Sequence, residues 1–128
     1  MDQENQEYTL WLERAEKDLK AAKNSLASQD YEWSCFQSHQ AAEKALKAVN
    51  LKEKKELLKT HDIVLLARKM NASQEIINAG SQLNPAYTGA RYPDVPASYS
   101  KEDAEQTLKK ARRSWHGQSS AYQRTKTL

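Results

Sequence analysis

A tetrad in the second half of the chain, Arg91-Tyr92-Pro93-Asp94, combines residue types that could bind a nucleotide. Pro93 fixes its own backbone angle and biases Tyr92 towards an extended conformation, so the side chains before it would be presented in a defined way. Arginine offers a planar fork for phosphate, and tyrosine offers an aromatic face for a base. The alternative is structural: Asp94 pairs with Arg91 while Tyr92 fills a gap in the protein. The residue types favour neither interpretation over the other.

Two other groups of residues could contact phosphate. Lys44 or Lys47, in the run from Gln37 to Lys47, could reach an anion, although Glu43 and Lys47 also have the spacing of an ordinary ion pair on a solvated helix face.

Arg112 and His116 lie four residues apart, so they would share one face of a helix. An arginine beside a histidine could stabilise charge and shuttle a proton on a phosphate substrate. A solvated basic face is the simpler interpretation of this pair.

Other chemistries lack their sequence patterns. Three scattered histidines and one cysteine give no metal-ligand spacing. There is no phosphate loop and no dinucleotide-binding fingerprint. Cys35 and His39 lie on an apolar helical stripe, where we expect the cysteine to be a core residue and the histidine to be packed and hydrogen-bonded. We therefore expect no metal site and no cofactor.

The elements that must position these residues are helices. No glycine occurs before Gly80 and no proline before Pro85, so long helices are favoured in the first half of the chain. Apolar residues recur at steps of three and four between residues 8 and 26, and again between 35 and 49. Asp30, Thr60 and Ser73 are expected to cap the second, third and fourth helices, and residues 52–59 form a polar connector or a fraying helix end.

Residues 84–100 interrupt the helical pattern because they contain all three prolines, one glycine and three tyrosines. We expect no helix there, and a loop of this length in a small domain is commonly functional or disordered. Ser100 to Asp103 has the pattern of a capping box at the start of the last helix. With no strand pattern anywhere, the sequence predicts an all-α, antiparallel up-and-down bundle of four to five helices. Residues 1–128 would form a single domain, with 117–128 as a basic tail prone to fraying.

Composition and charge set the remaining expectations. The single cysteine excludes an internal disulfide, and neither a signal peptide nor a membrane-spanning apolar run is present. We therefore expect a soluble, cytoplasmic protein with no membrane partner. Residues 1–30 carry seven acidic and four basic side chains, whereas residues 101–128 carry seven basic and three acidic ones. This asymmetry indicates either attraction between helices or an anionic partner at the basic end.

The order and spacing of several segments carry a further signal. They are Trp11-Leu12 with Ala15 and Asp18-Leu19, then residues 30–36, 40–47 and 61–66, then Tyr87 ahead of residues 91–94, and finally Glu102, Ala104 and Glu105. In this order they resemble the HEPN domain family of prokaryotic helical proteins, over roughly residues 8–115.

The resemblance implies an up-and-down helical bundle that pairs as a homodimer and is often encoded beside a minimal nucleotidyltransferase. Some members are toxins that cleave RNA, and others bind nucleotides without cutting. The residues that correspond by position to a nucleotide- or phosphate-binding site are Lys44, Lys47, Arg91, Tyr92 and Asp94.

The ribonuclease pattern of the family is not matched in this chain. RNA-cutting members carry an arginine and a histidine separated by more residues than the three between Arg112 and His116. The sequence therefore favours a nucleotide- or RNA-binding module that is the partner subunit of a separately encoded minimal nucleotidyltransferase. The alternatives are a metal-independent ribonuclease toxin that uses Arg112 and His116, and a scaffold that only holds the partner protein.

Overall fold

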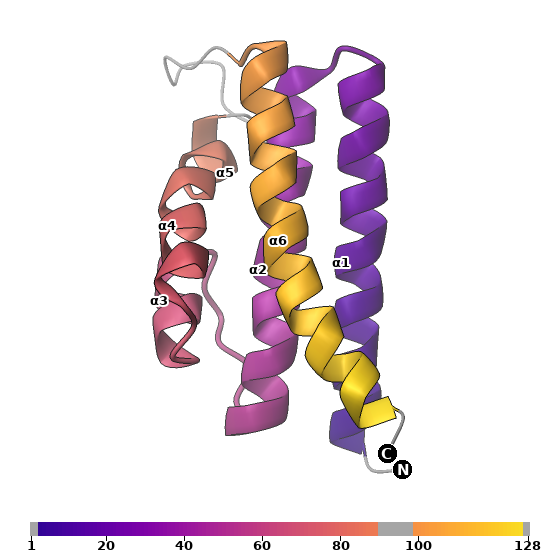
Figure 1. The fold of residues 1–128 in the computed structure, drawn as a ribbon, viewed down its shortest axis with the longest axis vertical. Helices are drawn as coiled ribbons and strands as arrows, with labels where there is room; N and C mark the ends of the chain where they lie inside the picture. Colours follow the sequence, from indigo (N-terminus) through magenta and orange to yellow (C-terminus); the bar gives the residue numbers. More distant parts are fainter. Residues whose placement is uncertain (1–2, 90–98, 127–128) are drawn as a thin grey trace.

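Helix α2 lies at the centre of the fold in the computed structural model, which describes residues 3–89 and 99–126, and the side chains of 6–87 and 99–116. The helices are α1 (Gln3–Ala27), α2 (Tyr31–Lys54), α3 (Ile63–Lys69), α4 (Gln74–Leu83), α5 (Pro85–Gly89) and α6 (Lys101–Lys126). α2 runs antiparallel to α1 and parallel to α6, and α3, α4 and α5 stack along the outer side of α2 (Figure 1). α2 packs against each of the others. The described residues confirm the predicted all-α bundle, in which α1 runs antiparallel to both α2 and α6, with α5 as one short additional turn.

Small side chains bring the helices close together inside the chain. Ala41, Ala42 and Ala45 of α2 have no exposed surface, so their small size serves contacts within the bundle. Gly80 of α4 serves the same purpose against α3, because a Cβ at this position would lie 2.7 Å from Cγ2 of Ile63. The largest fully buried aliphatic side chains are Leu46, Ile63, Leu66 and Leu83.

Two of the predicted helix caps are confirmed. The Ser73 hydroxyl accepts a hydrogen bond from the Ile76 N–H at 3.4 Å. Ser100 and Asp103 form a reciprocal capping box, in which Asp103 N–H donates to the Ser100 hydroxyl and Ser100 N–H donates to the Asp103 carboxylate.

The other two caps differ from the prediction. Asp30 stands at the N-cap of α2, but its side chain makes no capping hydrogen bond. α3 is capped by Asp62 and not by Thr60. The Asp62 carboxylate accepts from the N–H groups of Val64 at 3.0 Å and Leu65 at 3.3 Å, while the Thr60 hydroxyl accepts from the Asp62 N–H at 3.1 Å. Thr60 therefore shapes the turn that leads into the cap.

The expectation of no helix in residues 84–100 is wrong for its first part. α5 begins at Pro85, directly after Asn84, whose backbone is itself helical with φ −51° and ψ −43°. Proline is tolerated here because the first turn of a helix needs no N–H donor from it. Residues 90–98, with Arg91, Tyr92 and Asp94, lie outside the described residues.

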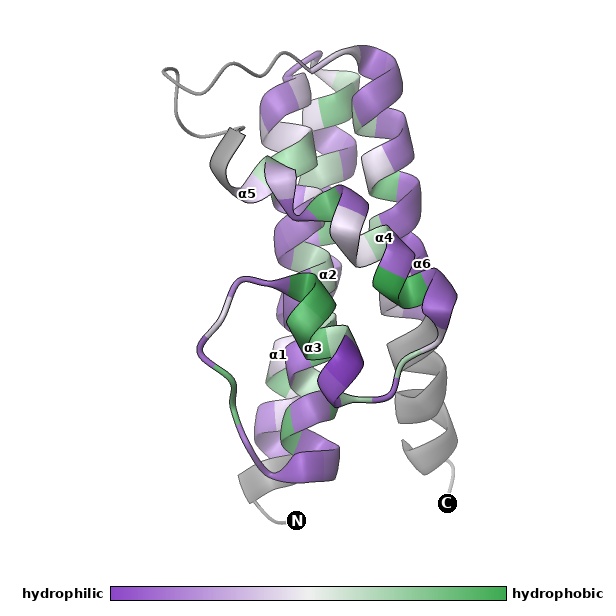
Figure 2. Cartoon of the chain, turned by 90° about the vertical axis from the view of Figure 1, so that its left-hand side faces the viewer, coloured by the Kyte–Doolittle hydropathy of each residue, from purple (hydrophilic) through white to green (hydrophobic). Residues whose placement is uncertain are grey.

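The last features of the fold are the C-terminal ends of α2 and α6. α2 continues to Lys54, and its C-cap residue, Lys55, has a left-handed backbone with φ 57°. Residues 55–62, called the connector from this point, then run back along α2 towards α3 (Figure 2). The backbone of α6 is helical to Lys126, through most of the predicted basic tail. No helix in the described part of the chain is long and apolar enough to cross a membrane.

Candidate functional site

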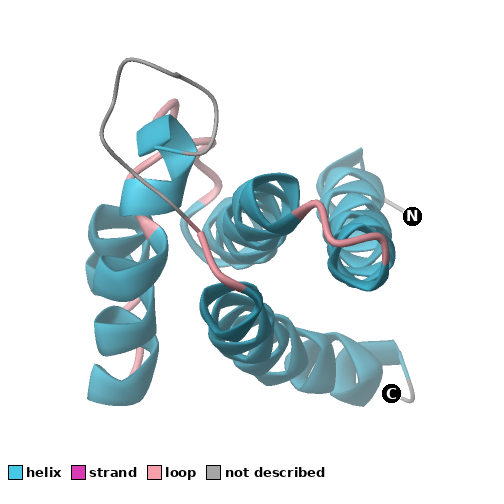
Figure 3. Cartoon of the chain, turned by 90° about the horizontal axis from the view of Figure 1, so that it is seen from above, coloured by secondary structure: helices cyan, strands magenta, loops and turns pink. Residues whose placement is uncertain are grey.

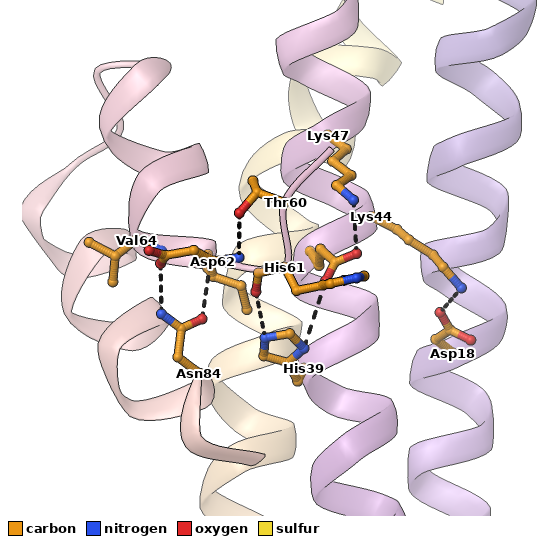
Figure 4. A network of polar contacts seen from close by, with 11 residues as sticks. Asp18, His39, Lys44, Lys47, Thr60, His61, Asp62, Val64 and Asn84 are labelled. Carbon is orange, nitrogen blue, oxygen red and sulfur yellow. Dashed lines mark hydrogen bonds and ion pairs between the residues drawn. The ribbon is translucent and has the colours of Figure 1, made fainter. Parts of the chain in front are cut away.

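A buried carboxylate on α2, that of Glu43, organises the most polar part of the interior, where the side chains of His39, Lys47 and His61 come together (Figure 4). Its Oε1 lies 2.8 Å from Nδ1 of His61 in the connector, and its Oε2 lies 3.1 Å from Nζ of Lys47. Glu43 is only 3% exposed and Lys47 only 7%. The predicted Glu43–Lys47 ion pair is therefore present, but the expected solvated face is wrong, because the connector carries His61 over it.

His39, one helical turn before Glu43 on α2, binds the backbone of the connector at His61. This histidine is fully buried, and its Nε2 donates to the backbone carbonyl of His61 at 3.1 Å. Burial lowers the pKa of His39, against the opposing effect of the Glu43 carboxylate, so the neutral ring is favoured. The prediction of a packed, hydrogen-bonded histidine is confirmed. Two contacts therefore hold His61: Glu43 binds its ring, and His39 binds its backbone carbonyl.

The lowered pKa of His39 predicts that acidification destabilises the protein. The unfolded chain binds a proton near the ordinary histidine value of 6.5, whereas the folded chain resists it, so stability is lost as the pH falls below that value. The His39→Gln variant keeps an N–H donor for the His61 carbonyl but does not titrate. Its free energy of unfolding, measured in urea between pH 7 and pH 5, should fall less steeply than that of the wild type. Parallel pH profiles would contradict this prediction.

An aromatic cluster lies beside the polar centre. Tyr87 of α5 stacks on the His61 ring, with 4.3 Å between ring centroids and 19° between ring planes. Tyr87 also lies 6.1 Å from Phe36 and 5.4 Å from His39, and Trp33 packs edge-on against Phe36 at 5.9 Å. The side chain of His61 is 51% exposed, so this cluster reaches the surface. Glu43, His61 and Tyr87 were not predicted as site residues, although all three fall in the segments that carry the family resemblance.

Asn84 positions the connector against the end of α4. Its side-chain oxygen accepts from the Ile63 N–H at 2.9 Å, and its amide nitrogen donates to the Asp62 carboxylate at 2.8 Å. Since Asn84 directly precedes α5, these two bonds join the residues that follow His61 to the helix that carries Tyr87. The stacking of Tyr87 on His61 therefore rests on a hydrogen-bonded frame.

The two predicted lysines both bind carboxylates. Nζ of Lys44 lies 2.6 Å from the Asp18 carboxylate of α1, with both side chains about one quarter exposed. Lys47 pairs with Glu43 as described above. For either lysine to bind phosphate, its present carboxylate partner would first have to be released.

The remaining predicted residues lie elsewhere or belong to the core. Arg112 and His116 are exposed one turn apart on α6, and no described side chain of that helix belongs to the cluster around Glu43. Cys35 is fully buried with its sulfur 3.7 Å from the Thr107 hydroxyl, and burial raises the pKa of its thiol, so its predicted core role is confirmed. Within the described residues, no three His, Cys, Asp or Glu side chains come together as a metal site would require.

Comparison with known proteins identifies similar folds. A profile of the HEPN domain matches residues 8–116. The crystal structure of TT1696 from Thermus thermophilus is 31% identical, covers 88% of this chain and 96% of its own, and superposes with a TM-score of 0.82. ST0689, described as an archaeal HEPN homologue, is 30% identical over 89% of this chain and 96% of its own, with a TM-score of 0.78. An HEPN domain protein from Thermotoga maritima, 24% identical over 89% of this chain and 98% of its own, shares the fold with a TM-score of 0.74. A search of curated proteins finds no match.

Proposed function

The chain belongs to the HEPN domain family, and from this premise we propose that it is a nucleotide- or RNA-binding helical module. The observation that carries the proposal is the aromatic cluster of Phe36, His61 and Tyr87, held rigidly by Glu43 at the protein surface. Aromatic rings that reach the surface are the platforms on which nucleic-acid bases stack.

The chain also offers a cation for phosphate near this cluster. Arg91 follows Tyr87 by four residues, and four extended residues span at most about 14 Å. In this proposal the arginine contacts the phosphate of a ligand that stacks on Tyr87. Within the pair Glu43–Lys47 the charges cancel, so Arg91 supplies the positive charge in this proposal, with Tyr92 and Asp94 beside it.

Replacing Tyr87 by alanine should weaken nucleotide binding. One stacked base contributes about 1–3 kcal/mol, which corresponds to a loss of about fivefold to a hundredfold in affinity. The measurement is titration calorimetry with ATP, GTP, their monophosphates and a short single-stranded RNA. The Tyr87→Phe variant keeps the ring and should bind as the wild type does, and Arg91→Ala should weaken binding of every ligand that carries phosphate. Absence of heat from the wild type at millimolar ligand would contradict the proposal.

The second part of the proposal is a homodimer formed through α1. The side of the α1–α2 pair that faces away from α6 is left uncovered by other helices in the described part of the chain (Figure 3). A shallow depression on the bundle is lined by Glu7, Leu10, Trp11, Arg14 and Lys44, and Leu10 is 55% exposed. Glu7 and Arg14 stand two helical turns apart on either side of the apolar pair. If two copies of α1 pack antiparallel about this point, each Glu7 faces Arg14 of the second copy, which satisfies the two-fold symmetry of most dimers.

A charge swap tests this dimer. The single variant Glu7→Arg would place like charges together and should shift the protein towards monomer in size-exclusion chromatography with light scattering. The double variant Glu7→Arg/Arg14→Glu restores the complementarity and should restore the dimer. A monomeric wild type, or a double variant no better than the single one, would contradict the proposed interface.

The third part concerns the partner protein. Family membership supports a separately encoded minimal nucleotidyltransferase as that partner, which co-purification of the two proteins would test. The three-residue separation of Arg112 and His116 does not favour the ribonuclease alternative. Release of discrete RNA fragments by the wild type but not by His116→Ala would favour the ribonuclease instead.

A further inference from the structure

The hydrogen bonds around His61 determine which of its ring nitrogens carries the proton. The Glu43 carboxylate faces the Lys47 ammonium through Oε2, and a carboxylate paired in this way can only accept hydrogen bonds. Its Oε1, 2.8 Å from Nδ1 of His61, therefore receives the Nδ1–H of the ring. In a neutral imidazole the other nitrogen, Nε2, is then an acceptor. The buried pair thus sets the tautomer of an exposed histidine.

The acceptor nitrogen is available to a ligand. Nε2 of His61 has no hydrogen-bond partner within the described part of the chain, and the side chain is 51% exposed. The ring cannot turn away, because Glu43 holds Nδ1, Tyr87 covers one face, and His39 holds the backbone carbonyl. A fixed acceptor beside a stacking platform selects for ligand groups that donate a hydrogen bond.

Only some groups of a nucleotide can donate to this nitrogen. Fully ionised phosphate oxygens only accept hydrogen bonds, so they have no proton to donate to an acceptor Nε2. The amino groups of a base that stacks parallel to Tyr87 and His61 lie in the plane of that base, away from the edge of the imidazole. The ribose projects from the side of the stack. Its hydroxyls are donors that are not confined to the plane of the base, so they can reach the edge of the imidazole.

We propose that His61, with its tautomer fixed by Glu43 and Lys47, accepts a hydrogen bond from the ribose 2′-hydroxyl of the bound nucleotide and so selects ribonucleotides over deoxyribonucleotides. This inference rests on the proposed nucleotide binding and names the chemical group that the same site reads. A purely structural His61 would tie the connector to α2 with no preference between the two sugars.

Matched ligands test the inference. The probes are ATP, 2′-deoxy-ATP and 3′-deoxy-ATP, together with a hexamer of uridines and a hexamer of deoxyuridines, each titrated by calorimetry into the wild type, His61→Phe and Tyr87→Ala. Loss of one hydrogen bond is expected to weaken binding about threefold to tenfold. The wild type should therefore prefer the RNA hexamer over the DNA hexamer, and ATP over 2′-deoxy-ATP, by that factor, whereas 3′-deoxy-ATP should bind as ATP does.

The variants separate the inference from the proposed function. His61→Phe retains a ring on Tyr87 and should bind RNA as weakly as DNA, whereas Tyr87→Ala should weaken both equally. Equal binding of the ribose and deoxyribose ligands by the wild type would overturn the inference alone and leave nucleotide binding intact. An equal loss for RNA and DNA in His61→Phe would show a phosphate or stacking contact instead and would also overturn it. Absence of binding by every probe would overturn both proposals.

Discussion

Replacing Glu43 by alanine is expected to lower the free energy of unfolding by about 3–5 kcal/mol, as measured by urea denaturation at pH 7. The substitution leaves the Lys47 ammonium, with a side chain 8% exposed, without the carboxylate 3.1 Å away. It also releases the ring of His61, which Oε1 holds at 2.8 Å. The remaining neighbour of the ammonium is the Trp11 ring at 5.8 Å, and a cation–π contact of about 0.5–2 kcal/mol does not replace a buried ion pair.

Two further variants identify the cause of this loss. The double variant Glu43→Leu/Lys47→Met removes both charges and should recover much of the stability, since apolar replacement of a whole buried pair is often neutral or stabilising. Glu16→Ala on the exposed face of α1 is the control and should change stability by about 0.5 kcal/mol or less. If Glu43→Ala cost no more than this control, Glu43 would not organise the site.

The helices could be predicted from the sequence because their signals are local. Spacings of three and four residues mark the buried faces of α1 and α2, and Ser73 and Ser100 cap their helices through contacts within one turn. The start of α3 could not be predicted from local signals. Thr60 and Asp62 are both good capping residues, and the choice between them involves Asn84, which bonds the Asp62 carboxylate from the end of α4. No local pattern encodes that contact.

The candidate site was harder to predict for the same reason. A glutamate and a lysine four residues apart have the same pattern whether they are exposed or buried. His61 and Tyr87, which decide that Glu43 and Lys47 are buried beside an aromatic cluster, lie 18 and 44 residues beyond Glu43 in the sequence. The resemblance to a family included these positions in its segments, but it assigned them no role. Their role follows only from the distances between them.

Leu46→Ala should produce a second large loss, about 2–5 kcal/mol in the free energy of unfolding. Leu46 is fully buried and packs with Ile63, Leu66 and Leu83, so it joins α2 to α3 and α4. Urea denaturation of the variant would measure the loss.

The size of this loss follows from the alanines that surround Leu46. Because Ala41, Ala42 and Ala45 already hold the helices close to α2, neighbouring side chains on this helix are too short to fill the space that the leucine leaves. A cavity that cannot collapse costs more than the transfer energy of the removed atoms alone. Leu57→Ala in the connector, where the leucine is 43% exposed, provides the matched control and should cost little. If the two leucine variants lost similar stability, the core around α2 would be repacking freely, and the rigid frame that we infer beneath His61 and Tyr87 would lose its support.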